Sequence, residues 1–139
     1  MTVFTINVRI YYEDTDMAGI VYYANYLRYL ERARTEWLRA AGFELDHIQN
    51  DLGAVFVVRR VEADYHQPAR LGDLITVTCE PMKVGHSKLV VAQRMFRGSI
   101  DRGERLFTAT VTLAYIASDF SKPIAMPAAM RAAMATPAH

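Results

Sequence analysis

The residues best suited to chemistry lie in a short acidic segment, Glu13-Asp14-Thr15-Asp16, just before a glycine at position 19. An amphipathic helix pattern begins soon after this glycine, so Asp16 is expected close to a helix N-terminus. The first N–H groups of a helix have no intrahelical partner and carry partial positive charge. A carboxylate beside such donors can act as nucleophile or general base while the donors stabilise an oxyanion, which is what acyl transfer requires.

The acidic segment is open to three other interpretations. The simplest is a solvated turn whose carboxylate stabilises the helix N-terminus. A calcium loop would place Asp14, Asp16 and Gly19 at positions one, three and six, but Ala18 and Asn25 then stand where two oxygen ligands are needed. A transition-metal site needs a nearby His or Cys, which the segment lacks. The residues alone therefore leave the solvated turn and the catalytic carboxylate open, and they indicate neither a metal site nor a cofactor.

Two elements must position this segment, and both follow from the spacing of apolar residues. Residues 3–12 alternate apolar and polar side chains, which predicts a strand with one buried face. From about residue 22 the apolar residues recur every three to four positions, which predicts an amphipathic helix of about five turns. Asn25 is the expected cap of this helix, and Gly42 is expected just beyond its end.

The rest of the chain predicts four more strands joined by short turns, at about 55–65, 75–80, 89–96 and 107–115, and a short helix at 127–134. Val55, Val57 and Val61 are expected on one face of the first of these strands, and Pro81 is expected to end the second. Because short turns join antiparallel neighbours, the four strands are predicted to form a meander. The helix would cover the apolar face of the sheet, giving an α+β fold.

The length and composition are those of one globular domain over residues 1–139. A single helix cannot cover both faces of a five-stranded sheet, so a homo-oligomer is expected. The net charge of +1 argues against a nucleic-acid partner, and no apolar run reaches the roughly 20 residues that a membrane span needs. The N-terminus shows no signal peptide, and the only cysteine, Cys79, has no partner for an internal disulfide. We therefore expect a cytoplasmic location.

The segment Asp14-Thr15-Asp16-Met17-Ala18-Gly19-Ile20-Val21-Tyr22-Tyr23-Ala24-Asn25-Tyr26 resembles the signature of hotdog-fold acyl-CoA thioesterases. It is similar to the 4-hydroxybenzoyl-CoA thioesterases and to the Tol-Pal-associated, YbgC-like thioesterases. Residues 29–36 bring it nearer the second group, and Pro68-Ala69-Arg70-Leu71-Gly72-Asp73 belongs to the same pattern. The resemblance covers about residues 7–127. It implies the hotdog fold, in which a five-stranded antiparallel sheet wraps a long central helix.

The resemblance also implies an activity, the hydrolysis of acyl-CoA thioesters to free acid and CoA. Asp16 would be the nucleophile or general base, and the backbone amide of Tyr23 would polarise the thioester carbonyl. Many Tol-Pal-associated members have a histidine where this chain has Tyr23, whereas the hydroxybenzoyl-CoA enzymes have an aromatic residue there. A phenol with a pKa near 10 is a poor base at neutral pH, so this departure favours a role for the N–H rather than the side chain. The departure also favours the alternative of an aromatic acyl-CoA thioesterase.

Relatives of this kind form dimers or dimers of dimers, so the resemblance implies a homotetramer or homodimer with the acyl pocket at a subunit interface. It also implies possible association with the Tol-Pal envelope machinery or with phospholipid enzymes. A non-catalytic acyl-CoA binding or scaffold protein that keeps this fold is the second alternative.

A CoA ester carries phosphates, which basic side chains at the mouth of the pocket would bind. The expected substrate-binding residues are Tyr22, Asn25, Arg59, Arg60, Arg70, Lys83 and Lys88. His66 and His86 raise the alternative of a hydratase, but a position on the surface or at an interface is the simpler expectation for both.

Overall fold

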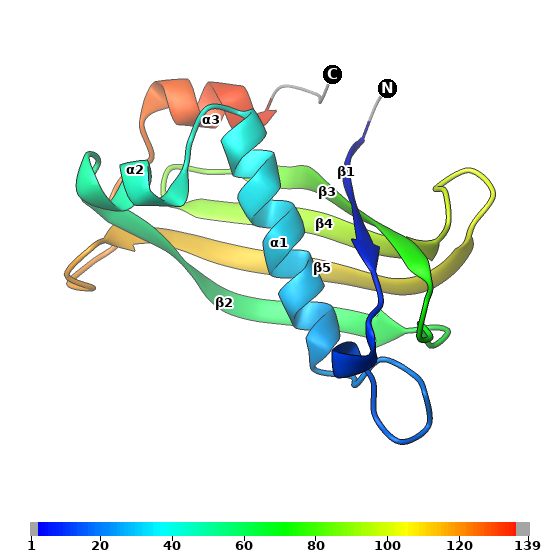
Figure 1. The fold of residues 1–139 in the computed structure, drawn as a ribbon. Helices are drawn as coiled ribbons and strands as arrows, with labels where there is room; N and C mark the ends of the chain where they lie inside the picture. The colour runs from blue at the N-terminus through cyan, green and yellow to red at the C-terminus, as the bar shows by residue number, and fades with distance from the viewer. Residues whose placement is uncertain (1–2, 136–139) are drawn as a thin grey trace.

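The computed structural model describes residues 3–135. The elements in chain order are β1 (Phe4–Arg9), a 3-10 turn (Tyr12–Asp14), α1 (Asn25–Ala40), α2 (Leu45–Asn50), β2 (Ala54–Tyr65), β3 (Leu74–Val84), β4 (Lys88–Arg97), β5 (Glu104–Ala117) and α3 (Ala128–Ala135). The five strands form one antiparallel sheet in the order β1-β3-β4-β5-β2, and α1 crosses one of its faces (Figure 1). The predicted α+β fold with a central helix and a five-stranded sheet is confirmed.

The predicted meander is correct for β3, β4 and β5 but wrong for β2. This strand pairs with β5, from Ala54 opposite Ala117 to Tyr65 opposite Phe107, and so forms the edge of the sheet farthest from β1. The connection at 66–73 has eight residues and can span more than 20 Å, whereas crossing from β2 to β3 covers three strand spacings, or about 14 Å. A connection of this length therefore does not require its two strands to be neighbours.

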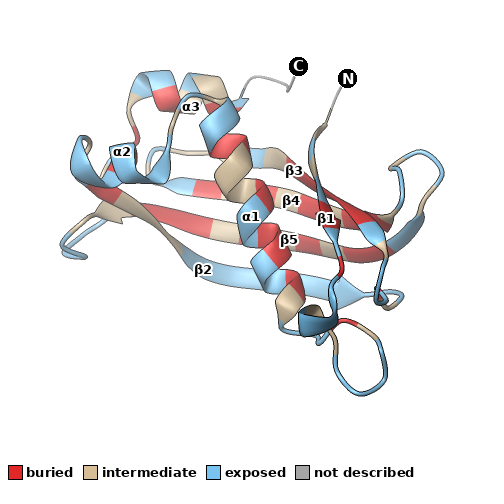
Figure 2. Ribbon diagram, viewed as in Figure 1, coloured by how far each residue is buried: buried red, intermediate tan, exposed pale blue. Residues whose placement is uncertain are grey.

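The hydrophobic core lies between α1 and the sheet face that it crosses. On α1 the buried side chains are Tyr26, Tyr29, Leu30, Ala33, Trp37 and Leu38. Figure 2 shows this buried side of the helix against the buried middle of the sheet. The short C-terminal helix was predicted correctly, and its Met130 and Met134 are buried together with Met126. No helix within residues 3–135 has the length and apolar character to cross a membrane.

One prediction about β2 is wrong because the strand contains a register shift between Val58 and Arg60. Side chains that face each other across two paired strands lie on the same side of the sheet. Val58 pairs with Leu113, and after the shift Val61 pairs with Val111, so these side chains share the face that α1 covers. Val55 and Val57 instead lie on the opposite face, because one extra residue reverses the alternation.

Three predicted boundaries also differ from the structure. β1 ends at Arg9, because the chain then turns into the 3-10 segment that leads to the acidic loop. α1 begins only at Asn25 and has 16 residues. β3 continues through Pro81, where a second register shift lies between Pro81 and Lys83. Within residues 3–135 the pairing of β1 with β3 ends opposite Cys79, and the register shift beside Pro81 is a bulge, a place where a sheet tolerates proline.

Candidate active site

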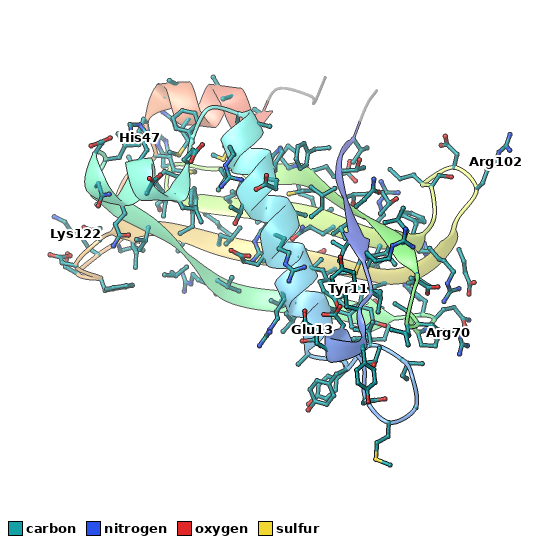
Figure 3. The ribbon with its side chains drawn as sticks, in the orientation of Figure 1. Tyr11, Glu13, His47, Arg70, Arg102 and Lys122 are labelled. Carbon is teal, nitrogen blue, oxygen red and sulfur yellow. The ribbon has the colours of Figure 1, made fainter. Side chains whose placement is uncertain are left out.

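The acidic segment forms a closed loop beside the first turn of α1. The backbone carbonyl of Asp14 accepts hydrogen bonds from the N–H of Tyr22 (3.0 Å) and from Nδ2 of Asn25 (2.9 Å), and Thr15 forms an isolated bridge with Val21. These contacts hold the start of the helix against the base of the loop. Figure 3 shows Tyr11 and Glu13, at the 3-10 turn that leads into this loop, beside the start of α1, while His47 and Lys122 lie at the other end of the molecule.

Asn25 was predicted as the helix cap, and this is wrong. The N-cap residue is Ala24, which makes no side-chain capping bond, and Asn25 is the first residue of the helix. Its side chain instead points back to the Asp14 carbonyl and closes the loop. At least one polar group of Asn25 is therefore already bonded within the chain, which weakens its predicted role as a substrate contact.

The carboxylate of Asp16 is oriented by its own loop. Its Oδ1 accepts a hydrogen bond from the N–H of Ala18 at 3.0 Å, and its backbone N–H donates to the carbonyl of Ile20 at 3.0 Å. Gly19 has φ +75°, a conformation that glycine adopts at little cost and that lets the loop turn back. Asp16 is exposed, and within residues 3–135 its Oδ2 has no hydrogen-bond partner. One carboxylate oxygen is thus held while the other is available to a reactant.

Free N–H donors lie directly beyond this loop. The N–H of Asn25 donates to the carbonyl of Tyr22 at 2.9 Å, but the N–H groups of Tyr23 and Ala24 find no acceptor in the described part of the chain. No side chain in the described part of the chain caps α1, so these donors and the partial positive charge of the helix N-terminus are available to a bound group. The arrangement can stabilise an oxygen that becomes negatively charged.

The loop is fastened to the body of the protein by the turn at 68–73. The N–H of Val21 donates to the carbonyl of Ala69 (2.9 Å), the N–H of Leu71 donates to the carbonyl of Gly19 (3.2 Å), and Ile20 forms a bridge with Arg70. This places Arg70, a predicted phosphate contact, at the same end of the molecule as Asp16. The turn at 68–73 therefore acts as the support of the candidate site.

Arg97 in turn clamps that support, a role that the sequence did not reveal. Its Nε lies 2.9 Å from Oδ2 of Asp73, its Nη2 donates to the carbonyl of Pro68 at 2.6 Å, and its Nη1 lies 2.6 Å from Oε2 of Glu104. Asp73 also accepts the N–H of Arg70 at 2.8 Å. The hydrogen bond to Asp73 raises the pKa of Arg97, so the guanidinium is charged throughout the accessible pH range.

An aromatic cluster lies beneath the helix start. Tyr26 stacks on Phe107 with ring centroids 5.1 Å apart, and its hydroxyl accepts the N–H of Ala69 at 3.0 Å. Tyr65 meets both rings edge-on and donates its hydroxyl to the carbonyl of Tyr23 at 2.9 Å. Burial raises the pKa of the Tyr26 and Tyr65 phenols, which therefore remain neutral at physiological pH. From the sequence, Tyr65 is expected only as part of the strand at about 55–65.

The two other tyrosines at the helix start face solvent. Tyr22 is 47% and Tyr23 64% exposed, and their rings lie 5.0 Å apart. Both are placed where a substrate acyl group at the helix N-terminus could contact them.

The predicted basic contacts do not form one cluster. Arg59, Arg60 and Lys88 line a single hollow of about 360 Å³ between β2 and the start of β4, and Arg60 also pairs with Glu62 at 3.0 Å. Lys83, on β3, does not line this hollow. Tyr65, which bonds to Tyr23 beside the acidic loop, is five positions along β2 from Arg60, which corresponds to about 17 Å. Within one chain, the three-residue basic hollow is therefore well separated from the acidic loop.

Comparison with known proteins identifies the family. Residues 18–104 match the model of the thioesterase superfamily. The chain belongs to this superfamily. It is 38% identical over 130 residues to the acyl-CoA thioesterase YbgC of Haemophilus influenzae, an alignment that covers 94% of this chain and 93% of the relative.

Solved structures agree with this assignment. A probable thioesterase from Bartonella henselae is 30% identical, with a TM-score of 0.83, and the match covers 91% of this chain and all of that one. A 4-hydroxybenzoyl CoA thioesterase mutant in complex with 4-hydroxybenzoyl CoA has a TM-score of 0.85 at 21% identity, with 94% of this chain and 96% of that chain covered. The second match shows the shared fold only.

Proposed function

We propose that this thioesterase hydrolyses acyl-CoA thioesters to a free acid and CoA, with Asp16 as the chemical residue and the Tyr23 N–H as a donor to the thioester oxygen. The proposal rests on two groups on the two sides of one closed loop. Within residues 3–135, one carboxylate oxygen of Asp16 and the N–H of Tyr23 have no hydrogen-bond partner. The YbgC relative supports CoA esters as the substrate class.

Two routes are consistent with this pairing. In one, an oxygen of Asp16 attacks the thioester carbonyl, the C–S bond breaks, and the thiolate leaves; water then hydrolyses the resulting anhydride and restores the carboxylate. In the other, Asp16 accepts a proton from water while the water oxygen attacks the carbonyl, and the proton passes to the leaving thiolate. In both routes the carbonyl oxygen becomes negatively charged beside the Tyr23 N–H, which stabilises it. Both routes require Asp16 to be ionised.

The phosphates of CoA are proposed to bind at the hollow lined by Arg59, Arg60 and Lys88, with Arg70 as a further contact near the acidic loop. β2 is an edge strand, and Val58 (48%) and Val61 (38%) are exposed along it. An exposed apolar edge of this kind favours a second copy of the chain as its cover. We accordingly propose a homodimer or a dimer of dimers. The cytoplasmic location and the Tol-Pal association stay predictions.

The test is thiol release from butyryl-, octanoyl-, palmitoyl- and benzoyl-CoA. Asp16→Asn removes the charge but keeps the shape, and kcat should fall by about 100-fold to 10,000-fold. Glu13→Gln is the matched control, because Glu13 is an exposed carboxylate of the same segment with no hydrogen bond in the described structure, and its kcat should stay within about twofold. Tyr23→Phe should also stay within about threefold, since the backbone N–H is retained.

Near wild-type turnover by a folded Asp16→Asn variant would overturn the assignment of Asp16. The exposed ring pair of Tyr22 and Tyr23 favours a second candidate, an aromatic acyl-CoA thioesterase, because aromatic acyl groups stack well on such rings. A kcat/KM for benzoyl-CoA well above that for octanoyl-CoA would select this candidate. Binding of CoA esters by the wild type without any thiol release would instead indicate a binding or scaffold protein.

A further inference from the structure

We propose that Tyr65 is a positioning residue for the oxyanion site: its hydroxyl fixes the Tyr23–Ala24 peptide so that the Ala24 N–H acts beside the Tyr23 N–H as a second donor. This inference rests on the proposed hydrolytic function. It adds a residue from the far edge of the sheet to a site that is otherwise built from one loop and one helix start.

The two donors belong to neighbouring peptide groups whose carbonyls are both bonded. The carbonyl of Tyr22 accepts the N–H of Asn25 at 2.9 Å, and the carbonyl of Tyr23 accepts the hydroxyl of Tyr65 at 2.9 Å. A trans peptide is planar, so its N–H points opposite to its carbonyl. Fixing the two carbonyls therefore fixes the directions of the Tyr23 and Ala24 N–H groups.

The same bonded carbonyls also strengthen the two N–H donors. Neither the Tyr23 nor the Ala24 N–H has an acceptor within residues 3–135, whereas the carbonyl of each of the two peptides is bonded. A bonded carbonyl polarises its own peptide and makes the N–H a stronger donor. Each peptide is thus polarised while its N–H has no acceptor within residues 3–135, so both donors are available to an oxyanion at low reorganisation cost.

Two aromatic rings hold the side chain of Tyr65. Its ring lies edge-on to Tyr26 at 5.1 Å and to Phe107 at 4.8 Å, and Phe107 is also its cross-strand neighbour on β5. The raised pKa of the Tyr65 phenol keeps the hydroxyl protonated, so it remains a donor. The hydroxyl is therefore held in place by the sheet, and the sheet in turn determines the orientation of the Tyr23–Ala24 peptide.

The experiment compares Tyr65→Phe with Tyr12→Phe. Phe keeps the ring contacts of Tyr65 and removes only the hydroxyl. Tyr12 is 82% exposed in the turn before the loop, and its hydroxyl makes no hydrogen bond in the described structure, so Tyr12→Phe is the matched control. Removing an oxyanion donor lowers kcat by about 100-fold to 1000-fold. A donor that remains but loses its fixed direction should lower kcat by about tenfold. We expect kcat of Tyr65→Phe to fall about tenfold with KM within about twofold, and Tyr12→Phe to match the wild type.

A spectroscopic measurement separates positioning from general loosening. In the Asp16→Asn background, octanoyl-CoA with a ¹³C-labelled carbonyl is bound and its infrared stretch is compared with that of the free ester. The bound band should shift to lower frequency, and adding Tyr65→Phe should reduce this shift. Adding Tyr12→Phe should leave it unchanged.

The outcomes for the two proposals can be told apart. If Asp16→Asn abolishes turnover while Tyr65→Phe keeps the wild-type kcat and the full carbonyl shift, the positioning role is overturned and the hydrolytic function stands. If Asp16→Asn retains turnover, the role of Asp16 is overturned, and the kcat of Tyr65→Phe still decides the positioning role. Absence of thiol release by the wild type from every ester overturns both.

Discussion

Arg97 offers a test of how the body of the protein supports the acidic loop. The substitution Arg97→Met removes three contacts that join β4 to the turn at 68–73 and to β5, while keeping an unbranched side chain of similar reach. That turn holds the loop through Val21 and Leu71. The variant should therefore lose stability and also lose turnover.

The expected loss of stability in Arg97→Met follows from how exposed each bonding partner of Arg97 is. The side chains of Arg97 and Asp73 are 29% and 18% exposed, so their charge-assisted bond should contribute about 1.5 kcal/mol, and the bond to the Pro68 carbonyl about 1 kcal/mol. The Glu104 side chain is 49% exposed, and its pairing should add little. The free energy of unfolding should fall by about 2–3 kcal/mol. With a slope of about 2 kcal/mol per molar urea, the midpoint should move by about 1–1.5 M.

Urea unfolding is measured by circular dichroism at one fixed protein concentration, because association would make the midpoint concentration-dependent. Arg39→Met is the control, since Arg39 pairs with Glu36 and Glu44 on the surface, and its midpoint should match the wild type. Thiol release under stabilising conditions should show kcat lowered about threefold to tenfold for Arg97→Met, because a displaced loop misplaces Asp16. An unchanged midpoint for Arg97→Met, or equal shifts for both variants, would refute the conclusion that Arg97 stabilises the turn at 68–73.

Three further predictions test other parts of the structure. Gly19→Ala should lower the free energy of unfolding by about 1–2 kcal/mol and lower kcat, because φ is +75° there although space for a Cβ exists; urea unfolding and thiol release check this. Met130→Ala should cost about 2–4 kcal/mol in the same unfolding assay, whereas Met82→Ala, 62% exposed, should match the wild type. Burial raises the pKa of Cys79 and Tyr29, so the unfolded chain loses these protons first as the pH rises. Stability should therefore be full below about pH 8.5 and fall above it, and Cys79→Ala should flatten the first part of that fall in unfolding measured from pH 7 to 10.5.

The fold was predictable wherever the pattern of apolar residues was regular. One face of α1 is buried as its spacing predicts, and it carries Tyr26, Leu30, Ala33 and Trp37. The short helix α3 forms where it was expected. The order of β2 in the sheet could not be deduced, because pairing with β5 depends on how far the 66–73 connection reaches rather than on local pattern. The register shift between Val58 and Arg60 could not be deduced either. The apolar and charged residues on its two sides fit both an uninterrupted alternation and one with an extra residue.

The placement of Asp16 beside the start of α1 was predictable, whereas the contacts that support the acidic loop were not. The closeness of Asp16 to the start of α1 follows from adjacency in the sequence and was expected. Asn25 was misassigned because an asparagine at a helix start usually caps it, whereas here a carbonyl at the base of the loop competes for its amide. The contributions of Arg97 and Tyr65 come from strands far along the chain, and no local pattern marks a side chain that bonds to a backbone carbonyl of a distant turn.

The position of β2 at the edge of the sheet has a consequence for how the chain folds as it is made. Ala54 pairs with Ala117, so β2 leaves the ribosome roughly 60 residues before its partner strand is complete. At synthesis rates of about 5–20 residues per second, this segment waits for about 3–12 seconds without its native neighbour. The charged residues Arg59, Arg60, Glu62 and Asp64 lie within it and should lower the tendency of the waiting strand to aggregate with other unfolded chains. Their substitution by apolar residues should therefore lower the yield of folded protein during synthesis more than it lowers the stability of protein already folded.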